Sequence, residues 1–319
     1  MQQGDEEMKK FRDIYEKYGT VIVLLLLVTV ITIMNPKFLT TYNILNIFRQ
    51  VSINGLIALG MTFVIITGGI DLSVGAILGL SGMVLGLLVL GGTPDILAII
   101  IVIAFGALLG LFNGLLVAKV KLQAFIVTLA TMTMFQGITL IISDGLPAMG
   151  VTKNAPVLDF ISQGKLLGLP FPMIIFLVTF IVLFIVIEKT VYGRSVYAIG
   201  GNEEVARLSS IATVKTKSLV YVISGAMAAL AGVILTSRLS SAQPTAGAGY
   251  ELDAIAAVVI GGTSLAGGRG RIFGTLIGVL IIGVLNNGLN IIGVSSFYQQ
   301  VIKGLVILIA VILDRKSSR

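Results

Sequence analysis

Long stretches with at most one charged residue recur along the whole 319-residue chain, and they constrain its fold more than any other feature. A helix needs ~20 predominantly apolar residues to cross the hydrocarbon core of a bilayer. Candidate stretches lie near residues 18–34, 51–67, 72–90, 96–118, 124–142, 171–187, 219–236, 254–267, 272–289 and 297–313. They predict an all-α, polytopic transmembrane helical bundle of about ten spans in a lipid bilayer. The eighth stretch is too short to cross alone, so we expect a broken or re-entrant helix there.

Composition agrees with a membrane protein and excludes several classes of function. Hydrophobic residues make up 56% of the chain and charged residues 12%, against roughly 25% charged residues in soluble domains. The chain has no Cys and no His, which excludes disulfides, zinc sites of the usual kind and Cys/His or Ser/His/Asp catalysis. The phosphate-binding pattern G-x-x-x-x-G-K-[ST] is also missing. We therefore expect no cofactor and no enzymatic activity, with any ATP bound by another subunit.

The distribution of Lys and Arg predicts the orientation. With the N-terminus inside, 16 of the 22 basic residues fall on the inner side and five on the outer side, and Lys303 lies within a span. Basic residues favour cytoplasmic loops, so this excess explains the net charge of +7 without nucleic acid as a partner. The expected parts are cytoplasmic tails at 1–17 and 315–319, a transmembrane domain at 18–314, an outer loop at 143–170 and a cytoplasmic loop at 188–217.

A weak internal similarity points to a repeat. Residues 64–75 and 258–268 each combine the end of an apolar stretch, a Gly-Gly pair and the start of a new apolar run. Residues 111–115 and 285–289 share an Asn-Gly-Leu ending. Transporters are often built from such repeats, with substrate paths at helices that glycine interrupts. Chance similarity between Gly-rich membrane helices is the alternative, and the sequence leaves both open.

Glycines spaced by four residues predict close helix packing. Gly106, Gly110 and Gly114 lie on one helical face, where small residues let a neighbouring backbone approach although lipid provides no hydrophobic drive for association. A hinge is the alternative role for Gly261-Gly262 and Gly267-Gly268, which flank the short eighth stretch.

Polar side chains within the stretches are candidates for a substrate path, because each is costly unless it faces protein or a cavity. Amides and a carboxylate suit a neutral polyhydroxylated solute, whereas the lack of His speaks against a proton relay. Helix–helix hydrogen bonds are the alternative for each of them, and we expect Lys303 to reach towards the membrane interface. The candidate path residues are Asp71, Asn113, Gln136, Asn286, Asn287 and Asn290.

The cytoplasmic loop contains a short amphipathic helix beginning after Asn202. Asn is a favourable N-cap, and acidic residues in the first turn interact favourably with the helix dipole. Such a helix is suited to docking a partner, although similar helices also occur without one. The candidate docking residues are Asn202, Glu203, Glu204, Val205, Arg207 and Leu208.

Four segments, at residues 68–75, 197–204, 240–247 and 250–268, resemble permeases of bacterial ABC sugar importers. The resemblance covers residues 35–314 and is strongest to the ribose importers. It is less specific for the substrate, because galactose, xylose and autoinducer permeases are similar in these segments. The loop at 202–209 departs from the Glu-Ala-Ala pattern of other importer permeases, so individual contacts cannot be transferred there.

The resemblance implies a permease in the bacterial cytoplasmic membrane that translocates a small sugar by alternating access. It implies three partners: a second permease copy, a cytoplasmic ATPase with two fused nucleotide-binding halves, and an extracytoplasmic sugar-binding protein. It also implies that the capped helix at 202–209 contacts the ATPase. A stand-alone transporter driven by an ion gradient is the alternative, disfavoured because Asp71 is the one carboxylate expected near the spans.

Overall fold

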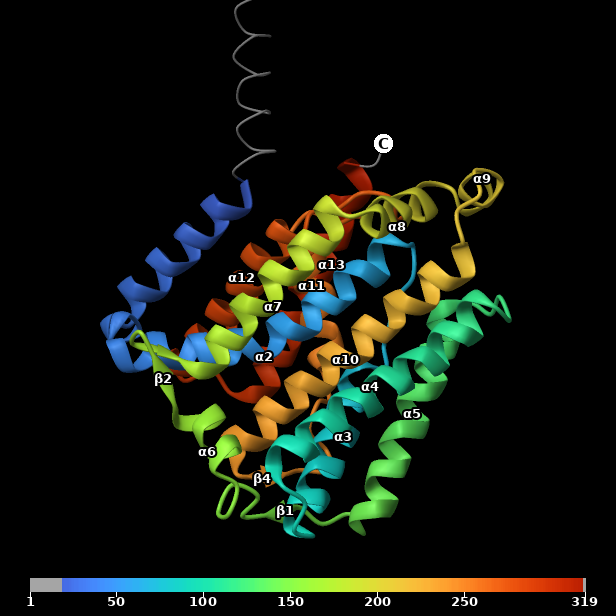
Figure 1. The fold of residues 1–319 in the computed structure, drawn as a ribbon. Coiled ribbons are helices and arrows are strands. Elements are labelled where there is room, and N and C mark those ends of the chain that lie inside the picture. The colour runs from blue at the N-terminus through green and yellow to red at the C-terminus, as the bar shows by residue number, and fades with distance from the viewer. Residues whose placement is uncertain (1–18, 318–319) are drawn as a thin grey trace, which may run out of the picture.

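The computed structural model describes residues 19–317, which form a helical bundle with a few two-residue strands (Figure 1). The tail predicted at 1–17 and the last two residues of the tail predicted at 315–319 lie outside the described residues. The helix α13 runs on to Ser317, three residues past the boundary predicted at 314. In the first part of the chain the elements are the helix Gly19–Met34, η1 Pro36–Leu39, α2 Thr41–Ile66, α3 Val74–Leu90, α4 Asp95–Ala118 and α5 Ala124–Ser143.

The second part of the chain begins with a folded connection and ends with the remaining helices. The expected outer loop at 143–170 is more structured than a simple loop, since it contains a helix and three short strands. The elements are β1 Ala148–Met149, α6 Pro156–Gln163, β2 Lys165–Leu166, β3 Leu169–Pro170, α7 Phe171–Lys189, α8 Val191–Gly201, α9 Glu203–Leu208, α10 Thr213–Leu239, β4 Ser241–Ala242, α11 Tyr250–Ile260, α12 Ile272–Ile292 and α13 Ser296–Ser317.

Each of the ten apolar stretches overlaps a described helix, although the eighth, at 254–267, is helical only as far as Ile260. The helical, polytopic character of the fold is thereby confirmed. Within residues 19–317, six helices are long and apolar enough to cross a membrane: α2, α4, α5, α7, α10 and α12. Gly19–Met34, α3 and residues 296–312 of α13 form shorter apolar helices. The eleven residues of α11 extend only about 16 Å, so this helix is as short as the sequence predicted.

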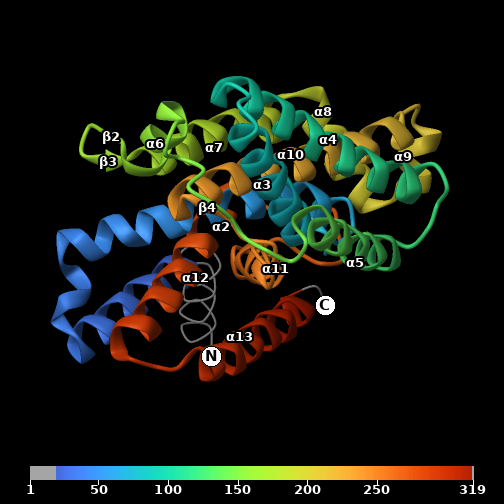
Figure 2. The same cartoon turned by 90° about the horizontal axis from the view of Figure 1, so that it is seen from below.

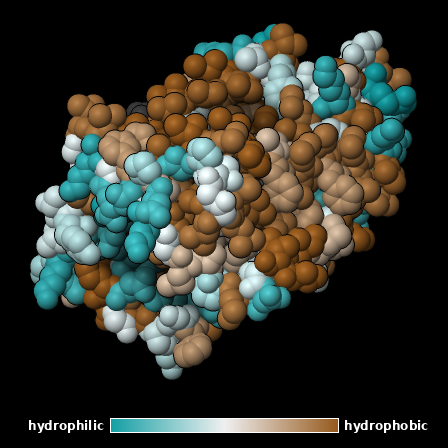
Figure 3. Space-filling view, turned by 60° about the horizontal axis from the view of Figure 1, so that its bottom comes forward, coloured by the Kyte–Doolittle hydropathy of each residue, from teal (hydrophilic) through white to brown (hydrophobic). Residues whose placement is uncertain are grey.

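The interior is built around α2 and α10, which pack on each other. α10 also packs on α3 and α4, and α2 on α7 and α12. In its most apolar stretch α2 is 89% buried, whereas the corresponding stretch of α4 is 22% buried although it is the more hydrophobic of the two. The space-filling view shows hydrophobic surface over most of the molecule, with hydrophilic residues gathered at two opposite ends (Figure 3). This distribution matches a protein whose outer helices face lipid.

Glycine residues allow α4 and α10 to pack closely, as the spacing of four residues predicts. A Cβ atom at Gly106, Gly110 or Gly114 on α4 would collide with the backbone or the Ala229 side chain of α10. On the facing side, a Cβ at Gly225 would meet the backbone of α4. The close approach therefore depends on glycine in both helices.

The loops predicted to lie outside the membrane and those predicted to lie inside the cell are found at opposite ends of the bundle. At one end β1 pairs with β4, joining the 143–170 connection to the end of α10. At the other end lie α8, α9, the turn between α4 and α5, and the C-terminal end of α13 (Figure 1). The break between α2 and α3 also contacts the break between α11 and α12 at this end, where the amide of Gly268 donates to the carbonyl of Ile66 at 2.9 Å.

Candidate functional site

A buried polar network surrounds the break between α2 and α3. The Oδ1 atom of Asp71 accepts bonds from the amide and the hydroxyl of Ser73, at 3.0 and 2.6 Å. Its Oδ2 atom accepts from the hydroxyl of Ser224 on α10 at 2.9 Å. Asn113 on α4 donates to the Ser73 hydroxyl at 2.8 Å. The structure thus brings together two predicted path residues, Asp71 and Asn113, both with 0% exposure.

The same network contains unused hydrogen-bonding capacity. The Oδ1 atom of Asn113 and the phenol oxygen of Tyr221 are buried and have no partner among the described residues. Buried polar groups are nearly always paired with protein or water. A water molecule or a solute hydroxyl bound to either group would therefore be stabilised.

Asn287, another predicted path residue, forms an amide pair with Asn43 near the start of α2. The two side chains exchange bonds of 2.8 and 2.9 Å, and Asn43 also donates to the carbonyl of Phe38. The pair joins α12 to α2 and is buried on both sides.

A second buried carboxylate, Asp253 in the first turn of α11, was missed by the sequence analysis. Its Oδ2 atom accepts from Lys303 on α13 at 3.0 Å and from Asn286 on α12 at 3.1 Å, with Asn54 on α2 at 3.5 Å. The expectation that Lys303 reaches towards the interface was wrong, because its ammonium group is bound to this carboxylate. The expectation that Asp71 alone approaches the spans was wrong for the same reason.

Gln136 and Asn290 are not brought into either network. Gln136 is exposed on α5, and Asn290 is exposed near the end of α12, where its Oδ1 atom accepts from Gln299 at 2.8 Å. Their role in a path stays a prediction.

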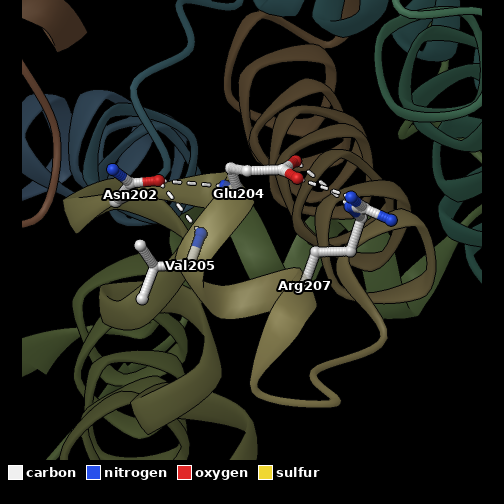
Figure 4. Close-up of polar contacts among 4 residues, drawn as sticks. All are labelled: Asn202, Glu204, Val205 and Arg207. Atoms are coloured by element: carbon white, nitrogen blue, oxygen red, sulfur yellow. Dashed lines mark hydrogen bonds and ion pairs between the residues drawn. The ribbon is translucent and has the colours of Figure 1, made fainter.

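The predicted capped helix is confirmed as α9. The side-chain oxygen of Asn202 accepts from the amides of Glu204 and Val205, at 3.0 and 3.1 Å (Figure 4). Two further predicted residues, Glu203 and Glu204, occupy the first turn, and Val205 and Leu208 are exposed.

Ion pairs fix the charged face of α9. Arg207 donates through Nε to Glu204 at 3.1 Å (Figure 4), and Lys217 at the start of α10 donates to Glu203 at 2.8 Å. The hydrogen bond and charge of Arg207 lower the pKa of Glu204 below its usual value, so Glu204 is ionised at neutral pH. The helix presents a fixed charge pattern beside two exposed apolar side chains.

An apolar groove lies beside α9. It has a volume of about 700 Å³ and is lined by Leu111 and Leu115 of α4, by Arg207 and by the first turns of α10, including Lys215. Exposed apolar lining with basic residues at its edge is suited to an apolar side chain of a partner with acidic neighbours.

The helix α8 connects α9 to the two helix breaks. The phenol of Tyr197 donates to the carbonyl of Gly270 at 3.0 Å. Burial, with a smaller effect of Glu188, raises the pKa of Tyr197 to about 12, so the phenol remains a donor at neutral pH. A Cβ atom at Gly200 would collide with the carbonyl of Ile66 and the amide of Gly268. The helix α8 is thus in direct contact with the end of α2 and with the break between α11 and α12.

Comparison with known proteins identifies related sequences over almost the whole chain. The model of a family described as branched-chain amino acid transport system / permease component matches residues 43–311. The chain is 56% identical to a ribose import permease protein of Bacillus subtilis, covering 99% of this chain and 98% of the relative. It is 49% identical to a ribose import permease protein of Escherichia coli, covering 93% of each. A D-allose transport system permease protein of Escherichia coli is 45% identical, covering 96% and 93%. No solved structure matches the chain.

Proposed function

Because the chain belongs to this family of transport-system permeases, we propose that it is the transmembrane subunit of an ATP-driven importer that moves ribose across the bacterial cytoplasmic membrane by alternating access. The observation that supports this proposal most strongly is the 56% identity with a ribose import permease along nearly the full length of both chains. The helices of membrane-spanning length support a multi-pass location.

Uptake by cells that lack their own ribose importer tests the substrate. Cells that express this chain with its partner proteins should accumulate labelled ribose, and cells without the ATPase should not. D-allose and L-arabinose are the informative competitors, because permeases for both are related at 45% and 38% identity. Ribose uptake that persists without the ATPase would favour an ion-coupled transporter, and uptake of arabinose alone would contradict the substrate.

The proposed partners follow from the permease role. ATP hydrolysis belongs to a separate cytoplasmic ATPase, and an extracytoplasmic sugar-binding protein delivers the sugar. We propose further that the ATPase has two fused halves and that two copies of this chain form the pore. Native mass spectrometry of the purified complex should find two permease chains for each ATPase chain; a ratio of one to one would contradict this assembly.

The proposed topology has ten membrane segments, with α11 entering only part of the bilayer and both termini in the cytoplasm. The grouping of basic loops at the end of the bundle that holds α8 and α9 supports it. Since the chain has no Cys, single cysteines can report sidedness. An impermeant thiol reagent outside the cell should label Lys153→Cys and leave Arg207→Cys unlabelled, and the reverse pattern would exclude this orientation.

Energy coupling is proposed to run through α9. Its apolar residues Val205 and Leu208 can enter a groove on the ATPase, while Glu204 and Arg207 set the register. Motion of α9 would reach the helix breaks through α8, which touches both of them.

Exchanging the charges of Glu204 and Arg207 tests this coupling. The double variant Glu204→Arg with Arg207→Glu keeps an ion pair within α9 but inverts the charges that a partner meets. We expect loss of ribose uptake and weaker co-purification of the ATPase. Asn202→Ala, which removes one cap at ~1 kcal/mol of helix stability, should be milder. Normal uptake and ATPase binding in the double variant would place coupling elsewhere.

The proposed path is lined by Asp71, Asn113, Gln136, Asn286, Asn287 and Asn290. Asp71 and Asn113 are enclosed in this conformation, so they would face the path in another state of the transport cycle. Asn113→Leu and Asn287→Leu should lower uptake while the permease still inserts, and Thr133→Val on the exposed face of α5 should not. If both Leu variants transport normally, these amides only join helices.

A further inference from the structure

The ion pair between Asp253 and Lys303 lies at the centre of a polar cluster formed by four helices. We propose that Asp253, Lys303 and Asn286 form a site within the membrane that binds hydroxyl groups of the transported sugar. The inference rests on the proposed function, since it presumes that a polyhydroxylated solute passes through this chain. No local pattern in the sequence indicates that these three residues lie together.

The cluster is organised around one carboxylate oxygen. Oδ2 of Asp253 on α11 accepts from Lys303 on α13, Asn286 on α12 and, at the longest distance, Asn54 on α2. Asn54 and Asn286 lie well inside their helices, away from the ends that face water. Asp253 follows the irregular segment between β4 and α11, which packs against the glycines of α3.

The cluster has donors and an acceptor that the protein does not use. The ammonium group of Lys303 carries three N–H donors, and one bond, to Asp253, is found among the described residues. The Oδ1 atom of Asn286 is buried and has no partner there. A sugar hydroxyl both donates and accepts, so two neighbouring hydroxyls could bind the free amide oxygen and the ammonium group together.

The site can be reached from the surface of the chain. The side chain of Lys303 is 31% exposed, whereas that of Asp253 is 9% exposed. α13 stands at the edge of the bundle, where it packs on α11 (Figure 2). The cluster therefore lies where a peripheral helix meets the short helix α11, and the side chain of Lys303 is the part of it that reaches the surface of the chain.

Stability alone gives a poor reason for the ion pair. Moving two charges out of water costs several kcal/mol per ion, and well-packed apolar residues are often as stabilising as a buried pair. Ionisable side chains within membrane segments accordingly tend to mark substrate or ion pathways. A tie between α11 and α13 that serves only the fold is the competing explanation.

The test uses the complete importer of permease, ATPase and sugar-binding protein in proteoliposomes. The quantity measured is ribose transported per ATP hydrolysed, together with hydrolysis stimulated by the loaded binding protein. Lys303→Met and Asp253→Asn should each lower ribose per ATP about tenfold, while stimulated hydrolysis stays within about twofold. Gly304→Ala is the matched control, because a Cβ there meets nothing within 4 Å, and it should behave as the wild type.

An exchanged pair separates a sugar site from a structural tie. Asp253→Lys with Lys303→Asp keeps opposite charges between α11 and α13 but reverses the groups offered to the sugar. We expect it to remain folded and uncoupled. Recovery of the wild-type ratio would overturn the inference, as would normal ratios in both single variants. A wild-type importer that hydrolyses ATP without accumulating ribose would instead refute the proposed function, and the inference with it.

Discussion

Two buried carboxylates, Asp71 and Asp253, both lie at interruptions of the helical bundle, yet their surroundings differ. Asp71 is fully enclosed and receives its bonds from two serines, without a cation among the partners that the structure describes. Asp253 is paired with Lys303, and its cluster extends to a partly exposed side chain. The first network closes a helix break, whereas the second remains open towards the surface.

This difference shows that burial of a carboxylate does not by itself define its role. Both bonded oxygens of Asp71 stabilise the turn into α3 and its contact with α10, so its removal should weaken the fold. One oxygen of Asp253 accepts hydrogen bonds from side chains that still have unused donors and acceptors. Replacing Asp253 should therefore affect transport more than folding. Unfolding measurements on variants of the two networks test this difference.

The largest expected effect is that of Asp71→Leu. The change leaves the amide and hydroxyl of Ser73 and the hydroxyl of Ser224 without their acceptor in the interior. A buried donor left without its acceptor costs about 1–3 kcal/mol, so with three such donors the free energy of unfolding should fall by about 3 kcal/mol or more. Thermal unfolding of the purified permease in detergent measures this. Asp159→Leu on the exposed face of α6 is the control, and equal stability of the two variants would remove the distinction between the carboxylates.

A smaller loss is expected for Ser224→Ala. Only the bond to Oδ2 of Asp71 disappears, while both bonds from Ser73 remain. One buried acceptor left without its partner costs about 1–2 kcal/mol. The same unfolding assay should place this variant between the wild type and Asp71→Leu, and a loss as large as that of Asp71→Leu would mean that α10 carries most of the network.

The smallest effect is expected for Asn54→Leu in the second network. Its donor lies 3.5 Å from Asp253, near the limit at which a hydrogen bond contributes. Interhelical bonds within membranes average only about 0.6 kcal/mol, so the stability should change by less than about 0.5 kcal/mol. A loss above about 1 kcal/mol would show that Asn54 holds Asp253 in place and that the second network is also structural.

Local features of the fold could be predicted from the sequence. Membrane helices follow from the length of apolar runs, because the bilayer forces each crossing segment to satisfy its own backbone. The start of α9 follows from Asn202 and two acidic neighbours, since capping acts within one turn. The Gly106–Gly114 face follows from a spacing of four residues on one helix.

Contacts between distant segments could not be predicted in the same way. Asp253 was not predicted as a site residue because it stands at the start of an apolar run. No sequence pattern around it indicates that Asn286 and Lys303 bind its carboxylate. The sequence features that could have indicated this ion pair are a carboxylate at the start of a short apolar stretch and a lysine inside another apolar stretch. Their partnership depends on how α11, α12 and α13 converge.

The amino-acid sequence was enough to predict a helical membrane protein, the segments that form its helices, and the residue at which the capped helix α9 begins. The central position of α2, which is less hydrophobic than α4, and the grouping of polar residues into two networks became known from the packing of the helices. The physical reason is that lipid is as apolar as the side chains themselves, so hydrophobicity carries a segment into the membrane but does not arrange it there. Close glycine contacts and hydrogen bonds between helices make that arrangement, and they form between residues far apart in the chain.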